Sequence, residues 1–170
     1  MSVKNNLTFF IPDVENTQEL PYFASGIKAG FPSPAADFDE SKISLDRVLV
    51  KNQEATFYAK ASGTSMIGAG IDDGDIMVID RSLEPQNNKI AVCCIDGEFT
   101  VKRISIKKDG VYLLPENKDY QAIKVTEENE LIIWGIVTYV IKSVWNKKEQ
   151  YSVLLFLFAL PSSKGINLMR

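Results

Sequence analysis

The chain has 170 residues, of which 45% are hydrophobic and 24% charged, a size and balance typical of one globular domain with appendages. Its formal net charge of −3 argues against a nucleic-acid-binding surface as the main function, since neutralising phosphates needs clustered Lys and Arg. The sequence contains no histidine, which excludes a Ser-His-Asp triad.

The cysteines and the N-terminus indicate the cellular compartment of the protein. Cys93 and Cys94 are adjacent within an apolar run, which suits neither a metal pair nor a dithiol redox motif, so we interpret them as core residues of a reducing compartment. The N-terminus shows no basic region followed by an apolar stretch of signal-peptide length. We therefore expect a cytoplasmic protein.

Residues 1–40 are predicted to form a flexible N-terminal arm. The prolines at 12, 21, 32 and 34 exclude a long helix or a central strand. Within the arm, Ala29 and Gly30 share a peptide bond with almost no side-chain bulk on either side, so it can enter a narrow cleft in extended form. An ordinary linker is the alternative interpretation.

Residues 41–142 are predicted to form one mainly β domain, a strongly bent sheet or partial barrel. The apolar pattern of residues 41–50 fits a short helix or simply the entry to the fold. Asp-Gly pairs at 96–97 and 109–110 are hairpin signals. The predicted strands are residues 56–60, 75–80, 90–95, 98–106 and 111–115, followed by a β-branched and aromatic run at 131–144.

Ser65 is the candidate nucleophile. It lies among small residues with Gly63 two positions before it, where the backbone can turn sharply and leave amide groups free to face a carbonyl oxygen. Serine needs a neighbouring base, and without histidine a lysine must act. Lys102 is the candidate because, in the middle of a predicted strand, it would be poorly hydrated and able to lose its proton near neutral pH. A lysine with its head group in water is the alternative.

Three segments together resemble the LexA-like self-cleaving serine peptidases, and within them the UmuD-like branch. Their order and spacing agree with the family from about Phe23 to Lys142. Residues 29–37 resemble the family's cleavage site. Residues 62–66, with 70–71 and 73–75, resemble its nucleophile segment, and residues 96–102 its lysine strand.

The resemblance implies a role for each matching residue. Ser65 would be the nucleophile, Lys102 the general base and Ala29-Gly30 the bond cut, with the backbone N–H groups of Thr64 and Ser65 as oxyanion donors. It also implies a mainly antiparallel β catalytic domain and a homodimer without cofactor or metal. The implied activator is the RecA filament on single-stranded DNA, and the implied client is a Y-family (UmuC-like) translesion polymerase subunit in the SOS response.

Two departures from the family pattern refine this expectation. Only 29 residues precede Gly30, which leaves no room for a helix-turn-helix reader of DNA and favours the UmuD-like branch over a repressor. The chain also continues beyond Lys142 with residues 143–170, which the family motifs do not explain.

Two other functions remain open on the sequence. A signal-peptidase-like enzyme acting on other proteins would also pair Ser-Met with a strand lysine, although such enzymes normally carry a membrane span, which this sequence does not show. The second open function is that of a non-catalytic β domain that binds a partner through its arm. Asp72, Asp73 and Asp75 suggest a turn rather than a calcium loop, because the remaining ligand spacing is missing.

The C-terminal extension contains ten consecutive mostly apolar residues, 151–160, closed by Pro161. Ten residues are about half of what a membrane-spanning helix requires. The segment is therefore expected to dock on the domain, to extend the dimer interface, or to lie on a membrane surface, and docking is the preferred interpretation.

Overall fold

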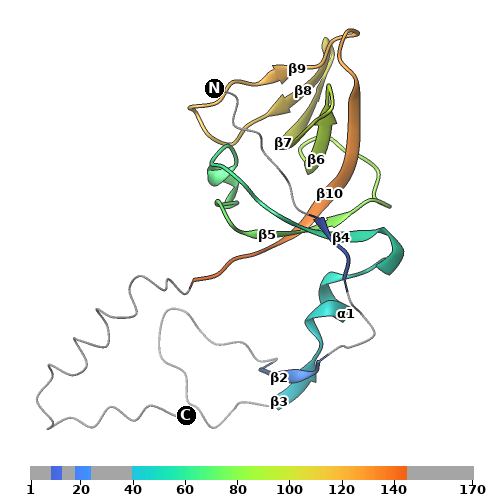
Figure 1. The fold of residues 1–170 in the computed structure, drawn as a ribbon, viewed down its shortest axis with the longest axis vertical. Helices are drawn as coiled ribbons and strands as arrows, with labels where there is room; N and C mark the ends of the chain where they lie inside the picture. The colour runs from blue at the N-terminus through green and yellow to red at the C-terminus, as the bar shows by residue number, and fades with distance from the viewer. Residues whose placement is uncertain (1–8, 13–17, 24–39, 145–170) are drawn as a thin grey trace, which may run out of the picture.

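A computed structural model describes residues 9–12, 18–23 and 40–144. The predicted cleavage bond Ala29-Gly30 and the extension beyond residue 144 lie outside these residues. The described part of the chain is mainly β, as predicted: an eight-stranded sheet carries the molecule, and a separate two-stranded hairpin lies beside a short helix (Figure 1).

The large sheet has the strand order β1-β4-β5-β10-β6-β7-β8-β9, and each neighbouring pair is antiparallel. Its strands are β1 (Phe9–Phe10), β4 (Thr56–Lys60), β5 (Ile76–Asp80), β6 (Ile90–Ile95), β7 (Glu98–Lys107), β8 (Gly110–Leu114), β9 (Ile123–Lys124) and β10 (Leu131–Ile141). The hairpin consists of β2 (Leu20–Phe23) and β3 (Glu40–Ile43).

Strand β10 bends the sheet and joins its two halves. Its first half pairs with β6 and its second half with β5, with one register shift between Ile133 and Gly135 and another between Val137 and Tyr139. A Cβ atom at Gly135 would lie 2.6 Å from a side-chain carbon of Ile79, so only glycine permits this approach. The bend confirms the prediction of a strongly bent antiparallel sheet.

Most predicted strands occur where the sequence places them. β4 and β6 have the predicted bounds, and Asp96 and Gly97 have the positive φ angles of 51° and 81° that a tight hairpin turn needs. The ambiguous residues 41–50 divide into β3 and helix α1 (Leu45–Leu49), with Ser44 as the N-cap between them. The sequence did not indicate β1, β2 or β9, because two to four residues are too few to show a period.

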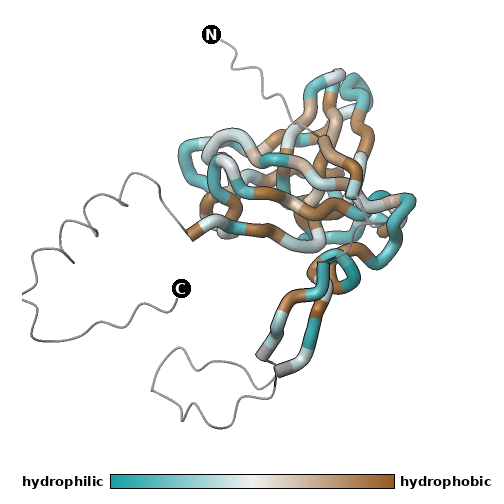
Figure 2. Tube along the Cα trace, turned by 60° about the horizontal axis from the view of Figure 1, so that its bottom comes forward, coloured by the Kyte–Doolittle hydropathy of each residue, from teal (hydrophilic) through white to brown (hydrophobic). Residues whose placement is uncertain are grey.

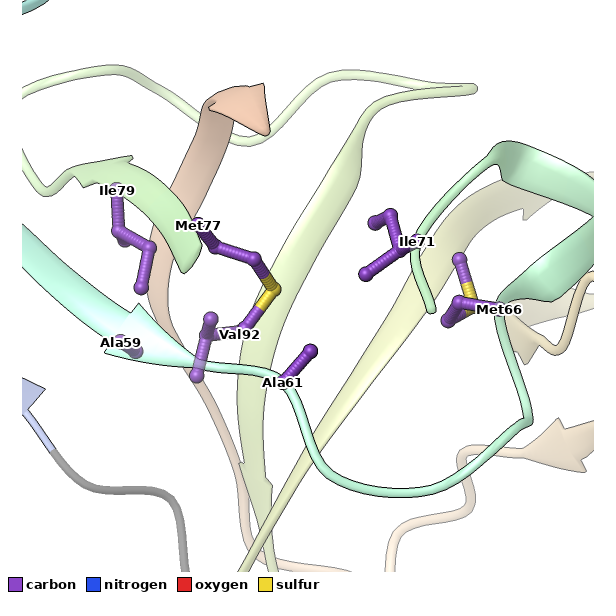
Figure 3. Close-up of a cluster of buried hydrophobic side chains, with 7 residues drawn as sticks. All are labelled: Ala59, Ala61, Met66, Ile71, Met77, Ile79 and Val92. Atoms are coloured by element: carbon purple, nitrogen blue, oxygen red, sulfur yellow. The ribbon is translucent and has the colours of Figure 1, made fainter. Parts of the chain in front are cut away.

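The core lies on both faces of the sheet. Figure 3 shows one cluster, in which side chains from β4, β5 and β6 meet three residues of the loop that follows β4; its members are Ala59, Ala61, Met66, Ile71, Met77, Ile79 and Val92. The other cluster consists of Ala91, Cys93, Ile104, Leu113 and Ile136. β6 contributes to both, which explains its uninterrupted apolar sequence. Figure 2 shows hydrophobic residues along the strands in the body of the domain, interspersed with hydrophilic ones, and hydrophilic residues at many of the turns.

Both cysteines are free, with Cys93 buried and Cys94 partly buried, as expected for core residues. Short 3-10 turns at Gln53–Ala55 (η2) and Ile67–Ala69 (η3) complete the fold. η3 matters for the site because it follows Ser65 directly.

Candidate active site

Ser65 lies in a loop between β4 and β5, residues 61–75, which we call the serine loop. Backbone hydrogen bonds close its two ends: Ala61 donates to the carbonyl of Asp75 at 2.8 Å, and Gly74 donates to that of Ala61 at 3.0 Å. Met66 and Ile71 are each only 3% exposed and enter the core cluster (Figure 3). The residue next to Ser65 is thereby anchored, which limits how far the serine can move.

A second segment, residues 114–120, holds the serine loop from the other side. The amide of Glu116 donates to the carbonyl of Ser65 at 2.9 Å, and Gly68 donates to the carbonyl of Glu116 at 2.7 Å. Asn117 Nδ2 donates to the carbonyl of Thr64 at 3.0 Å. A Cβ atom at Gly68 would overlap the carbonyl oxygen of Glu116, so this contact requires glycine. Sequence reasoning missed the segment, because no motif marks it.

Lys102 reaches Ser65 from β7. Its Nζ donates to Ser65 Oγ at 3.0 Å, to Thr100 Oγ1 at 2.9 Å and to the carbonyl of Val101 at 2.9 Å. Lys102 is only 6% exposed, which rules out the alternative of a lysine whose head group lies in water. Thr100, which the sequence analysis did not single out, is a direct partner of the amine.

Burial lowers the pKa of Lys102 below its ordinary value, because a desolvated site disfavours the ammonium form. A charged Cys93 would oppose this shift. Burial, however, raises the pKa of Cys93 to about 12, so its thiol is neutral throughout the physiological range and places no charge beside the lysine. All three hydrogen-bond partners of the amine are neutral as well. Desolvation therefore decides the protonation of Lys102.

A small cleft opens in front of the Ser65 hydroxyl. Its walls come from the serine loop and from the first half of β7, namely Ala61, Ser62, Gly63, Ser65, Met66, Ile71, Phe99, Thr100 and Val101. The amide of Gly63 is held by Asp73 Oδ1 at 2.8 Å, whereas no acceptor is recorded among the described residues for the amides of Thr64 and Ser65. The Thr64 hydroxyl lies 3.0 Å from that of Tyr120.

The acidic residues of the serine loop form a turn, as expected. Asp75 Oδ2 accepts from the amide of Asp72 at 2.8 Å, and Lys142, just after β10, forms ion pairs with both carboxylates. Burial acts to raise the pKa of Asp75, but the hydrogen bonds from Lys142 and from the Asp72 amide outweigh it and lower that pKa. Within the residues that the structure describes, no cluster of side chains could hold a metal ion, and no helix is long and apolar enough to cross a membrane.

Comparison with known proteins assigns the class. The family model described as Peptidase S24-like matches residues 21–138, so the chain belongs to this family of serine peptidases. Within the family it is a UmuD-like, LexA-related protein, as its relatives indicate.

Three relatives illustrate the relation. The chain is 40% identical to Protein MucA of Salmonella typhimurium over 71% of its own length and 82% of that protein. It is 39% identical to Protein SamA of the same species, over 78% of this chain and 92% of the relative. It is 37% identical to the LexA repressor of Alcanivorax borkumensis, over 74% of this chain but only 60% of the repressor.

Proposed function

We propose that this chain is a cytoplasmic peptidase that cuts its own Ala29-Gly30 bond with a Ser65-Lys102 dyad, and that the cut form serves a translesion DNA polymerase in the SOS response. The observation that carries the proposal is the 3.0 Å hydrogen bond between the Ser65 hydroxyl and the amine of Lys102, a residue that is only 6% exposed. A buried lysine whose hydrogen-bond partners are all neutral is unusual in a protein. It suits a general base that must act in its unprotonated form.

The first chemical step forms an ester. Neutral Lys102 accepts the Ser65 proton while Oγ attacks the carbonyl carbon of Ala29, and the amides of Thr64 and Ser65 stabilise the oxyanion. The bond between that carbon and the Gly30 nitrogen then breaks, and the ammonium of Lys102 returns the proton to the departing amine. The products are an Ala29 ester on Ser65 and a new N-terminus at Gly30.

The second step consumes one water molecule. Lys102, neutral again, removes a proton from water, and the resulting hydroxide attacks the ester carbon. When the ester bond breaks, Ser65 recovers its proton from Lys102 and Ala29 leaves with a free carboxyl group, which then loses its proton to the solvent. The dyad ends as it began.

The hairpin of β2 and β3 limits how far the Ala29-Gly30 bond can lie from the domain. Phe23 of β2 pairs with Glu40 of β3, so residues 24–39 leave and re-enter the fold at one place. Gly30 is ten residues before Glu40 and, with the hairpin paired, only seven after Phe23, a tether of up to roughly 25 Å. Either the active site of the same chain or that of a neighbouring chain in a homodimer can receive the bond if it lies within this reach.

The remaining partners follow from the UmuD-like assignment. We propose the RecA filament on single-stranded DNA as the activator and a Y-family, UmuC-like polymerase subunit as the client. Excluding water from the cleft would lower the pKa of Lys102 further, so an activator that presses the arm into the cleft would accelerate the cut.

Incubating the purified protein at alkaline pH and weighing the products tests the proposal. We expect a 30–170 fragment, and Ser65→Ala should reduce its formation by at least about 10³-fold without unfolding the domain. A folded Ser65→Ala protein that still yields the fragment would overturn the assignment. Cleavage of added peptides only would favour a signal-peptidase-like enzyme, and no cleavage at all a non-catalytic binding domain.

A further inference from the structure

Strand β1 covers one edge of the large sheet. It pairs antiparallel with β4, Phe9 opposite Ala59 and Phe10 opposite Tyr58, and is the first strand in the sheet order. Without β1, the backbone of β4 would become an unpaired edge, which can accept another strand. β1 also lies ahead of Ala29, so the proposed cut separates it from the domain.

Phe9 fills an aromatic seat, which we define as Phe57, Phe99 and Trp134. Its ring lies 4.3 Å from that of Trp134 and 5.3 Å from that of Phe99, between ring centroids. The residue opposite Phe9 is Ala59, whose small side chain leaves room for the ring. Phe10, by contrast, is 56% exposed. One aromatic side chain, rather than the strand as a whole, therefore makes the specific contact.

We propose that cutting the chain before Gly30 uncovers the β4 edge and the aromatic seat, and that an extended segment of a partner protein then adds to this edge as an antiparallel strand. The inference rests on the proposed cut. The segment carries an aromatic side chain in the place of Phe9. Recognition combines main-chain hydrogen bonds with one side-chain pocket, as in other cases of strand addition.

The cut matters because the described contacts of the arm are few. β1 contributes two paired residues and β2 four, and the Glu19–Arg47 ion pair is exposed. While the chain is intact, these contacts form within one molecule at an effective concentration on the order of millimolar. After the cut they must form between two molecules, so a partner segment can displace the arm.

Charge favours a foreign segment over a second copy of this chain. Lys60 at the end of β4 and Arg81 just after β5 are both exposed, and the Arg81 guanidinium lies 4.9 Å from the Trp134 ring centroid at the seat. Two copies would bring these cations to the same interface, where like charges repel. The partner segment is therefore expected to carry acidic residues beside its aromatic one.

The experiment uses the full chain with Ser65→Ala, which prevents self-cutting, and a recognition sequence for a foreign site-specific protease in place of residues 26–32. The probe is a synthetic peptide of residues 5–14, and binding is followed by Trp134 fluorescence in a Trp145→Phe background. After cutting by the foreign protease and removal of the arm, we expect the peptide to bind at least ten-fold more tightly than to the uncut chain.

Matched peptides test the seat without altering the protein. A peptide with Phe9→Ala should lose at least ten-fold in affinity, whereas Phe10→Ala should change it less than about three-fold, since that ring is largely exposed. Equal binding to cut and uncut protein, no binding to either, or equal loss with both substitutions would overturn the proposal. Self-association of the cut chain in place of peptide binding would do so too, in favour of a second copy. Because the protease is foreign, a failure of self-cleavage leaves this test unaffected.

Discussion

Lys102 and Lys142 both contact the serine loop, yet their surroundings are opposite. Lys102 is buried among neutral hydrogen-bond partners, and burial lowers its pKa. The side chain of Lys142 is 39% exposed, and the hydrogen bonds that it donates to Asp72 and Asp75 raise its pKa. The surroundings thus favour the neutral amine in one place and the cation in the other, although the side chain is the same.

Of the changes that test this difference between the two lysines, replacing Lys102 should reduce the rate of self-cleavage the most. Lys102→Met and Lys102→Arg should each slow self-cleavage by about 10²–10⁴-fold, the first because no base remains and the second because guanidinium stays protonated. Cleavage rates from mass spectrometry check this, with exposed Lys108→Met as the control. In the unaltered chain the rate should rise with pH through the lowered pKa of Lys102; a flat profile into strongly alkaline pH would contradict a lysine base.

Lys142→Met should have an intermediate effect. Without the cation, Asp75 is left buried beside Asp72 and the turn of the serine loop loosens, so we expect self-cleavage to slow by up to about ten-fold through misplacement of Ser65. The shape of the pH profile should not change, because Lys142 takes no part in proton transfer. Lys142→Arg, which keeps the ion pairs, should restore the rate. A shifted profile in Lys142→Met would mean that the two lysines are not distinct in role.

A smaller effect is expected on stability. The pKa of Lys102 is lowered in the folded chain relative to 10.5 when unfolded, so its burial penalty is full below the folded pKa, declines as pH rises through it and vanishes above 10.5. Lys102→Met should therefore stabilise the fold at neutral pH, by on the order of 1 kcal/mol or ~2–4 °C in Tm. The gain should shrink at high pH. Thermal unfolding of both forms at several pH values tests it, and a gain independent of pH would exclude desolvation as the cause.

Truncation after Lys142 should have the smallest effect. Lys142, which forms ion pairs with the serine loop, is kept in this truncation, and the family match ends at residue 138. Self-cleavage should continue at near the full-length rate, while solubility or self-association changes because the apolar segment 151–160 is gone. A truncated protein that is folded by circular dichroism but inactive would place the extension within the active unit.

Short-range patterns made much of this protein predictable. Alternation and Asp-Gly turns located most strands, because a strand and its hairpin turn are encoded within about ten residues. Small residues around Ser65 and the apolar strand around Lys102 indicated the candidate pair for the same reason. Residues 41–50 stayed ambiguous, since a four-residue strand and a five-residue helix are both shorter than the period that would distinguish them.

By itself, then, the sequence determined the fold class, the longer strands and the two residues of the candidate dyad, whose signals are local. Only the tertiary structure decided what supports them. Lys142 meets Asp72 and Asp75 across 70 and 67 positions of the chain, Glu116 closes the serine loop, and Phe9 enters a seat built from three different strands. No local pattern encodes such contacts, because they exist only after the bend in β10 has brought the two halves of the sheet together.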